Sequence, residues 1–187
     1  SRAARSYMIE RREMALQIYM NGSLVDAENA KVSVFDHGFL YGDGIFEGIR
    51  CYNGKVFRAK KHMERLWDSA KTLDIKIPIS KEEMLDAIYQ TVRANGFSDA
   101  YIRLVVTRGK GTLGLDAHLC SDPQVIVIAQ ALSLYSADFY DKGIKIVTAS
   151  TIRNPSDSVN PRVKSLNYLN NIMAKIEAHV AGCEEAL

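Results

Sequence analysis

The chain contains, at residues 34–50, the run Val34-Phe35-Asp36-His37-Gly38-Phe39-Leu40-Tyr41-Gly42-Asp43-Gly44-Ile45-Phe46-Glu47-Gly48-Ile49-Arg50. This run lies between two Asn-Gly pairs, Asn21-Gly22 and Asn53-Gly54, and each pair predicts a two-residue hairpin turn. Residues 35–44 include three glycines, which permit positive φ and close approach of the backbone to a ligand or a neighbouring subunit. We therefore expect β-hairpins on both sides of a glycine-rich loop.

Two helices are predicted after the second hairpin. Apolar residues recur at helical spacing over 59–73 and form one stripe, namely Met63, Leu66, Trp67, Ala70 and Leu73. Ser80 and Glu83 form a capping box that opens a second helix, and Asn95-Gly96 is a suitable end for it.

Strands are predicted over 101–107 and 124–129, the second as a continuous apolar run of the buried kind. Alternating strands and helices, with hairpins at the start, indicate a mixed α/β domain over 16–132. Residues 1–15 are expected to be a flexible or expression-derived arm, and residues 133–142 an interdomain linker.

A second unit is predicted over 143–187, with a strand over 144–149 and a helix that starts near Leu166 and ends at Gly182. The helix has one apolar face, which consists of Leu169, Ile172, Met173, Ile176 and Val180. One strand and one helix cannot bury a core. We therefore expect this second domain to be unfinished where the chain ends.

Composition excludes several classes of function. With 47% hydrophobic and 25% charged residues the chain has the composition of a soluble globular protein, and its net charge of +2 is too weak to indicate nucleic-acid or membrane partners. No apolar run reaches the length of a membrane span and no signal peptide is visible. Cys51, Cys120 and Cys183 are widely spaced, so we interpret them as free thiols in a reducing cytoplasm. The histidines show no metal-ligand spacing, and no metal site is expected.

Lys164 is the first candidate for chemistry. It lies in Val163-Lys164-Ser165-Leu166-Asn167-Tyr168-Leu169-Asn170-Asn171, where a β-branched stretch gives way to a helical pattern, and Tyr168 follows four residues later. A lysine at such a junction can be desolvated, lose its proton and form a Schiff base with a carbonyl. The alternative is an ordinary solvated lysine.

The segment Gly109-Lys110-Gly111-Thr112-Leu113-Gly114 matches G-x-G-x-x-G and follows a predicted strand. A dinucleotide-binding fingerprint must open a helix, and residues 116–123 are too short and broken for one. We interpret the segment as a flexible loop that could cover a substrate.

Two arginines are candidates for anion binding. Arg65 either pairs with Asp68 on an exposed helix face or holds a phosphate dianion with its rigid fork of donors. Arg103 lies in the middle of an apolar strand, where an arginine is costly unless it has an anion.

The acidic residues of the opening run favour structural roles. Glu47, near Arg50, is interpreted as a member of an ion pair or a loop anchor in preference to a catalytic acid. Asp36 and Asp43 are interpreted as turn residues. No serine or cysteine nucleophile motif completes a triad with Asp36-His37, so a hydrolase is not indicated.

Four separated motifs, in one order, resemble the class IV, fold-type IV aminotransferases that use pyridoxal 5′-phosphate, and within them the branched-chain aminotransferases. The motifs are residues 34–50, His62-Met63-Glu64-Arg65-Leu66, Ala100-Tyr101-Ile102-Arg103 and Val163-Lys164-Ser165-Leu166-Asn167-Tyr168-Leu169. The resemblance covers residues 18–187. It implies a small N-terminal α/β domain followed by the start of a larger, β-rich, cofactor-binding domain at 143–187.

The resemblance also implies roles for individual residues. Lys164 would form the internal aldimine and shuttle the proton between Cα and C4′. Arg65 would grip the cofactor phosphate, and Tyr168 would hydrogen-bond the 3′-oxygen. Three aromatic residues would supply the walls for a branched side chain, namely Phe46, Tyr41 and Tyr101. Arg103 would meet the distal carboxylate of glutamate or 2-oxoglutarate.

The resemblance further implies a homodimer, because Tyr41 and the loop 109–115 serve the active site across the subunit interface in this family. The expected reaction moves the amino group of a branched-chain L-amino acid to 2-oxoglutarate. The tract Tyr41-Gly42-Asp43-Gly44 also resembles D-amino-acid transaminases and aminodeoxychorismate lyases, which remain alternatives. The chain ends before the family's acidic partner of the pyridine nitrogen, so we expect the chain alone to be inactive or nearly so. A non-catalytic fragment or interaction domain is the third alternative.

Overall fold

The computed structural model describes residues 15–131 and 137–187. Its first unit is built on a six-stranded sheet with strand order β2-β1-β6-β5-β3-β4, in which all neighbours pair antiparallel. The strands are β1 (Gln17–Met20), β2 (Ser23–Asp26), β3 (Gly44–Tyr52), β4 (Lys55–Val56), β5 (Ala100–Thr107) and β6 (Val125–Gln130). Both predicted hairpin turns are confirmed, and Asn21 and Asn53 each have a φ of 50°.

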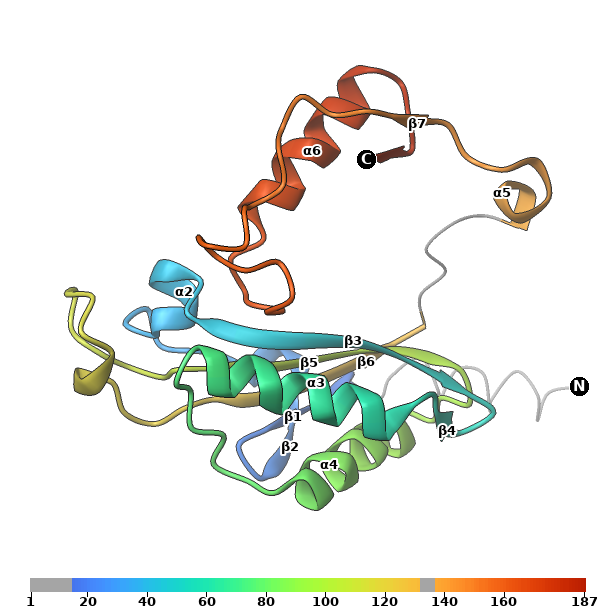
Figure 1. The fold of residues 1–187 in the computed structure, drawn as a ribbon. Helices are drawn as coiled ribbons and strands as arrows, with labels where there is room; N and C mark the ends of the chain where they lie inside the picture. The colour runs from blue at the N-terminus through green and yellow to red at the C-terminus, as the bar shows by residue number, and fades with distance from the viewer. Residues whose placement is uncertain (1–14, 132–136) are drawn as a thin grey trace, which may run out of the picture.

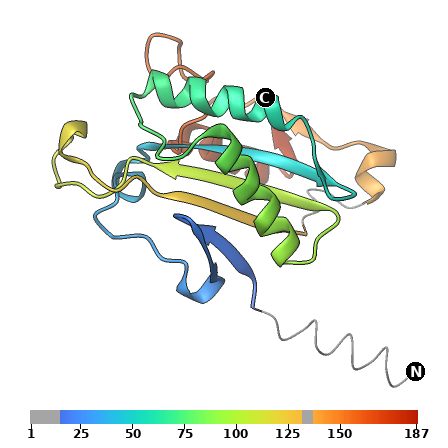
Figure 2. The same ribbon diagram turned by 90° about the horizontal axis from the view of Figure 1, so that it is seen from below.

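Two long helices cover one face of this sheet, α3 (Ala59–Thr72) and α4 (Lys81–Ala94) (Figures 1 and 2). The predicted apolar stripe of α3 faces the sheet, where Met63, Leu66 and Ala70 are buried. Burying Met63 and Leu66 contributes roughly 1.5–3 kcal/mol each. The capping box of Ser80 and Glu83 is present at the start of α4.

Because the helices lie on one side of the sheet only, strand β5 buries alternate residues along most of its length. In β5, Ile102, Leu104 and Val106 are fully buried, whereas the residues between them are half-buried. The apolar run of β6 behaves in the same way, so the prediction of a strand buried along its whole length was wrong. The face opposite the helices is turned toward residues 137–187 (Figures 1 and 2).

The glycine-rich segment is not only a loop, because it contains the short helix α2 (His37–Tyr41). The Asp36 carboxylate accepts a hydrogen bond from the Gly38 N–H at 2.7 Å and caps the helix, and Gly42, with φ of 69°, ends it. A side chain at Gly38 would come within 2.7 Å of Thr107 Cγ2. The close backbone approach that glycine permits here is thus to β5 of the same chain.

The second unit contains α5 (Ala137–Lys142), β7 (Ile146–Val147), α6 (Leu169–Val180) and β8 (Glu185–Ala186), with β7 and β8 parallel. The expected linker is helical from Ala137 onward, and residues 133–136 lie outside the described part. The predicted strand 144–149 is reduced to two residues. The predicted apolar face of α6 is exposed along its whole length. Short helices η1 (Ala27–Asn29) and η2 (Ala117–Leu119) complete the described elements.

Candidate active site

Lys164 is positioned by pairing with the edge of β3. Ser165 forms a β-bridge with Ile45, the Phe46 N–H donates to the Lys164 carbonyl at 3.0 Å, and the Leu166 N–H donates to the Gly44 carbonyl at 2.8 Å. These residues are therefore extended. Helix α6 begins at Leu169 and not near Leu166 as predicted.

A second contact ties Lys164 to helix α3. The Lys164 N–H donates to Ser69 Oγ at 3.2 Å, and Ser69 is buried on the sheet side of the helix. Sequence reasoning missed Ser69, because a serine within an amphipathic helix carries no signal of a contact 95 residues away.

The amine of Lys164 lies in a small polar and aromatic cluster. Its Nζ donates to the Tyr168 hydroxyl at 2.8 Å and lies 4.2 Å from the centre of the Phe46 ring. Phe46 and Tyr168 meet edge to face with ring centres 4.9 Å apart. The structure thus brings Phe46 of β3 together with Lys164 and Tyr168, which the sequence had singled out in one segment.

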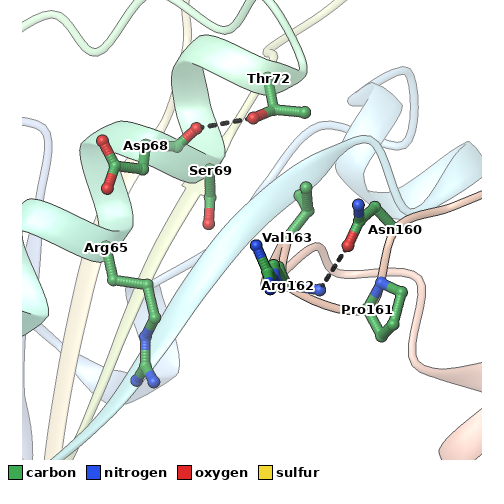
Figure 3. Close-up of a pocket in the computed structure, with 8 residues that line it drawn as sticks. All are labelled: Arg65, Asp68, Ser69, Thr72, Asn160, Pro161, Arg162 and Val163. Atoms are coloured by element: carbon green, nitrogen blue, oxygen red, sulfur yellow. Dashed lines mark hydrogen bonds between the residues drawn. The ribbon is translucent and has the colours of Figure 1, made fainter. Parts of the chain in front are cut away.

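Arg65 meets a buried carboxylate. Its Nε and Nη2 donate to the two oxygens of Glu47, each at 2.6 Å, and His62 Nδ1 lies 2.9 Å from Glu47 Oε2. The pairing of Arg65 with Asp68 is not formed, and Figure 3 shows the two side chains diverging from α3. Glu47 is a member of an ion pair, as predicted, and its partner comes from α3. Arg50, three residues further along β3, points to the opposite face of the sheet.

This contact affects the charge of Arg65. Its hydrogen bonds to Glu47 raise the pKa of the Arg65 guanidinium, against a smaller opposing effect of burial, and charge interactions with Glu47 and with Tyr168 add to the increase. The guanidinium therefore stays cationic throughout the working range of pH. His62, which sequence reasoning did not single out, could have been found from its spacing of three residues from Arg65 on one helix.

Arg103 lies on the sheet face opposite the helices, paired across the sheet with Gly48 of β3. Its guanidinium lies 4.5 Å from the centre of the Phe46 ring and 5.6 Å from that of Tyr101. Among the described residues its partners are these two rings and no carboxylate forms an ion pair with it. Such stacking is worth roughly 0.5–2 kcal/mol and partly offsets the cost of a central arginine.

Tyr41 is placed with a different set of residues. Its ring meets His37 edge to face at 5.0 Å, and its hydroxyl donates to the Leu113 carbonyl. The contacts of Tyr41 therefore connect α2 to the loop 109–114 of the same chain. They do not include the Phe46 cluster.

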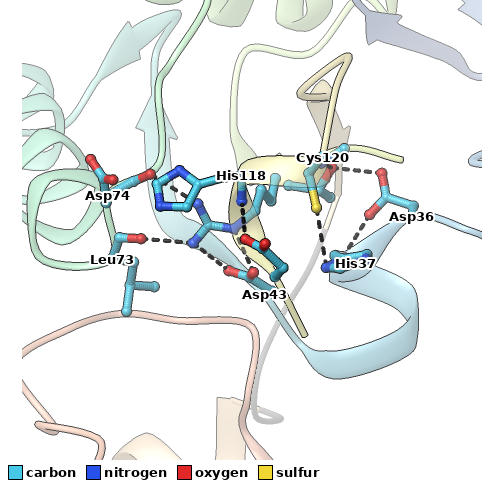
Figure 4. A network of polar contacts seen from close by, with 12 residues as sticks. Asp36, His37, Asp43, Leu73, Asp74, His118 and Cys120 are labelled. Carbon is cyan, nitrogen blue, oxygen red and sulfur yellow. Dashed lines mark hydrogen bonds and ion pairs between the residues drawn. The ribbon is translucent and has the colours of Figure 1, made fainter. Parts of the chain in front are cut away.

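The loop 109–114 contains no helix, as predicted. His37 is buried beneath it, with Nε2 2.8 Å from the Thr112 carbonyl and Nδ1 3.2 Å from Cys120 Sγ (Figure 4). Asp43, expected to be a turn residue, forms a double hydrogen bond with Arg108, whose guanidinium also donates to the carbonyls of Leu73 and Asp74. Burial raises the pKa of the Cys120 thiol, with smaller effects of the neighbouring charges.

A cavity of about 600 Å³ lies beside Lys164, between α3 and the segment that leads to the lysine. Arg65, Asp68, Ser69 and Thr72 line one side, and residues 160–163 line the other (Figure 3). No group of three potential metal ligands is present in residues 15–131 and 137–187. No helix in the same ranges is long and apolar enough to cross a membrane. The three cysteines are free thiols, as predicted.

The family model described as amino-transferase class IV matches residues 44–187, which include β3, Arg65, Arg103 and Lys164. The chain belongs to the class IV aminotransferases. Among curated members, it is 56% identical over 172 residues to a protein of Methanocaldococcus jannaschii that is provisionally named a branched-chain-amino-acid aminotransferase, covering 91% of this chain and 58% of that protein. It is 33% identical over 176 residues to the branched-chain-amino-acid aminotransferase of Escherichia coli K12, covering 91% of this chain and 57% of that enzyme.

Solved class IV aminotransferase structures share the fold. The E. coli branched-chain amino acid aminotransferase superposes with a TM-score of 0.87 at 33% identity, over 92% of this chain and 59% of that chain. The branched-chain aminotransferase of the thermophilic archaeon Thermoproteus uzoniensis, solved with norvaline, superposes with a TM-score of 0.84 at 36% identity. The superposition covers 92% of this chain and 59% of that chain. This class IV aminotransferase chain therefore has the mixed α/β architecture of fold type IV, and spans under two thirds of the relatives it matches.

Proposed function

We propose that the protein is a pyridoxal-phosphate-dependent aminotransferase that moves the amino group of a branched-chain L-amino acid to 2-oxoglutarate. The observation that carries this proposal is the placement of the Lys164 amine, 2.8 Å from the Tyr168 hydroxyl and over the Phe46 ring, in a class IV aminotransferase chain. The names of the matched relatives favour branched-chain substrates.

The residues present fit the cofactor. When bound, pyridoxal 5′-phosphate supplies a carbonyl that reacts with amines and a ring that accepts the electron pair released at the substrate Cα. The chain offers an amine for the carbonyl at Lys164 and a cation for the phosphate at Arg65. The hydroxyl of Tyr168 already accepts a hydrogen bond from the Lys164 amine, so it can orient Nζ and keep its lone pair directed.

We assign the proton transfer to Lys164 Nζ, which requires a neutral amine at the moment it takes a proton. The substrate pocket is assigned to the sheet face that carries Phe46, Tyr101 and Arg103. Phe46 excludes water from beside the amine, because its side chain is almost fully buried. Arg103, which stacks on both aromatic rings, would bind the distal carboxylate of the diacid substrate.

A homodimer is part of the proposal. Four apolar side chains in and before α2 and in the segment that follows β5 are 52–80% exposed and make a candidate interface, namely Phe35, Phe39, Leu113 and Leu115. Exposed apolar groups that cluster in this way are typical of interfaces between subunits. Tyr41 is joined to this set by the hydrogen bond from its hydroxyl to the Leu113 carbonyl and would complete the pocket of the partner subunit. We further propose that residues 143–187 are the first part of the cofactor-binding domain.

This function can be tested by cofactor labelling and activity assays on the complete protein. Addition of pyridoxal 5′-phosphate followed by borohydride should attach the cofactor to Lys164, as seen by peptide mass, and Lys164→Ala should remove the label. Transfer from L-leucine to 2-oxoglutarate should then be measured beside D-alanine and aminodeoxychorismate. Activity confined to D-alanine or to aminodeoxychorismate would assign the protein to one of the two other classes. No label in the unmodified protein would identify a non-catalytic domain.

A further inference from the structure

The carboxylate of Glu47 is placed where a strand normally carries an apolar side chain. Glu47 lies in the middle of β3, on the face covered by α3, between Ile45 and Ile49, and all three side chains are fully buried. A carboxylate in such surroundings is tolerated only if donors meet its oxygens. Its presence therefore needs a reason beyond the folding of the sheet.

Within the described residues 15–131 and 137–187, every donor that meets Glu47 comes from α3. Oε1 accepts from Arg65 Nε at 2.6 Å, and Oε2 accepts from Arg65 Nη2 at 2.6 Å and from His62 Nδ1 at 2.9 Å. Because a carboxylate accepts only, Nδ1 of His62 carries a proton. Glu47 thus holds the Arg65 guanidinium through two hydrogen bonds, and His62 holds the Glu47 carboxylate through a third.

The held guanidinium still has a free edge. Arginine carries five N–H groups, and Glu47 takes one from Nε and one from Nη2. Both N–H groups of Nη1 and the second of Nη2 remain, and no acceptor among residues 15–131 and 137–187 meets them. The Arg65 side chain is 50% exposed. An edge with two parallel donors is the geometry that binds an oxyanion in two places.

We propose that Glu47 is a positioning residue, which together with His62 locks Arg65 so that this free edge receives the phosphate group of the cofactor. The inference rests on the proposed function, since the phosphate is that of pyridoxal 5′-phosphate. Glu47 touches neither the cofactor nor the substrate and acts through Arg65 alone.

The direction in which Glu47→Gln changes the affinity for pyridoxal 5′-phosphate shows whether Glu47 acts by positioning Arg65 or only by its negative charge. Glu47 is an anion close to the place assigned to a dianion, so its charge alone opposes phosphate binding. If only charge mattered, Glu47→Gln would bind the cofactor more tightly. If Glu47 positions Arg65, the amide group of Gln cannot accept both arginine donors, the fork is released, and binding weakens.

The test compares dissociation constants of the complete protein for pyridoxal 5′-phosphate and for pyridoxal, which lacks the phosphate. We expect Glu47→Gln to weaken binding of the phosphate form about 10- to 100-fold, as for loss of a charge-assisted contact, and to leave pyridoxal binding unchanged. Glu64→Gln is the matched control, because Glu64 adjoins Arg65 on α3 but pairs with Lys61. It should leave both constants unchanged.

A mutant cycle tests whether Glu47 acts through Arg65. On an Arg65→Lys background, which keeps the charge and loses the fork, Glu47→Gln should cause no further weakening. Equal or tighter cofactor binding by Glu47→Gln, or a full additional loss in the double variant, would overturn the positioning role. Absence of a borohydride-trapped label on Lys164 in the unmodified protein would instead overturn the proposed function.

A milder variant applies if Glu47→Gln does not fold, as judged by circular dichroism. His62→Leu removes one donor from Glu47 and keeps the ion pair, so we expect about 2- to 10-fold weaker binding of the phosphate form. An unchanged dissociation constant for His62→Leu would then overturn the proposal.

Discussion

The amine of Lys164 lies 2.8 Å from the hydroxyl of Tyr168, although helix α6 begins only after Tyr168. The two residues are four apart, a spacing that brings side chains together within a helix. Here the backbone is extended at Lys164 and turns at Tyr168, so the contact is made by tertiary placement. The edge of β3 and the Phe46 ring hold the lysine and the tyrosine against each other.

Replacement of the lysine tests the centre of the proposed site. Lys164→Ala should abolish the borohydride-trapped label and lower transamination by at least about 100-fold, because the acid–base group is lost. Peptide mass and the initial rate check this. Lys175→Ala, which removes a lysine of α6 that pairs with Glu185, should keep both. A label that survives Lys164→Ala would contradict the assignment.

Removal of the tyrosine hydroxyl tests its contact with the amine. Tyr168→Phe keeps the ring against Phe46 and removes one hydrogen bond to a charged or reacting group, so the rate should fall about tenfold, or roughly 1.4 kcal/mol. Tyr140→Phe, at an exposed tyrosine of α5, should leave the rate unchanged. An equal rate in Tyr168→Phe and the unmodified protein would show that the hydroxyl does not act on the amine.

The buried contact between Ser69 and the Lys164 backbone should contribute to stability. Ser69→Ala leaves the Lys164 N–H without its acceptor, and the free energy of unfolding should fall by about 1 kcal/mol. Denaturant titration measures it. Thr72→Ala removes a hydroxyl one turn later whose hydrogen bond, in the described part of the chain, goes to the Asp68 carbonyl, and the free energy of unfolding should change by less than about 0.5 kcal/mol. Equal effects of the two variants would count against the tie between α3 and the lysine.

The packing of the loop 109–114 over α2 requires that residue 111 has no side chain. A Cβ at Gly111 would lie 2.5 Å from His37 Nε2 and 2.7 Å from Cys120 Sγ, so Gly111→Ala should destabilise the protein by roughly 1–3 kcal/mol. A Cβ at Gly114 would meet only Thr112 Oγ1 at 3.4 Å, and Gly114→Ala should be nearly neutral. The denaturation midpoints of the two variants measure this difference in stability. Equal midpoints would show that the loop does not pack on His37 as described.

Stability at low pH should depend on Glu177 of α6. Its carboxylate accepts hydrogen bonds from the backbone and hydroxyl groups of Ser150 and Thr151, and these bonds lower the pKa of Glu177 to about 2 from 4.5. The lowered pKa stabilises the fold fully above about 4.5, and this stabilisation is lost as the pH falls toward about 2. Melting temperatures across this range should fall less steeply in Glu177→Gln than in the unmodified protein. Glu28→Gln, at an exposed residue of η1, should keep the original slope.

Local patterns were sufficient for much of the first unit. The Asn-Gly turns, the apolar stripe of α3 and the capping box of α4 depend on residues within a few positions of each other, and all three are confirmed. Helix α2 was missed because its signals, a capping aspartate and a terminating glycine, were interpreted as signs of a loop. The true start of α6 was missed because pairing with β3 keeps Ser165 extended.

The sequence is sufficient to select the candidate residues: residue chemistry points to Lys164 and Arg65, and the resemblance to class IV aminotransferases points to Tyr168 and Phe46. It is not sufficient to select their partners. Glu47 meets Arg65, and Ser69 meets Lys164, only because a strand, a helix and a distant segment come together at one sheet edge. Short-range spacing encodes helices and turns, whereas contacts between distant residues are decided by packing. The tertiary structure alone therefore determined that Glu47 holds Arg65 and that the Ser69 hydroxyl holds the Lys164 backbone.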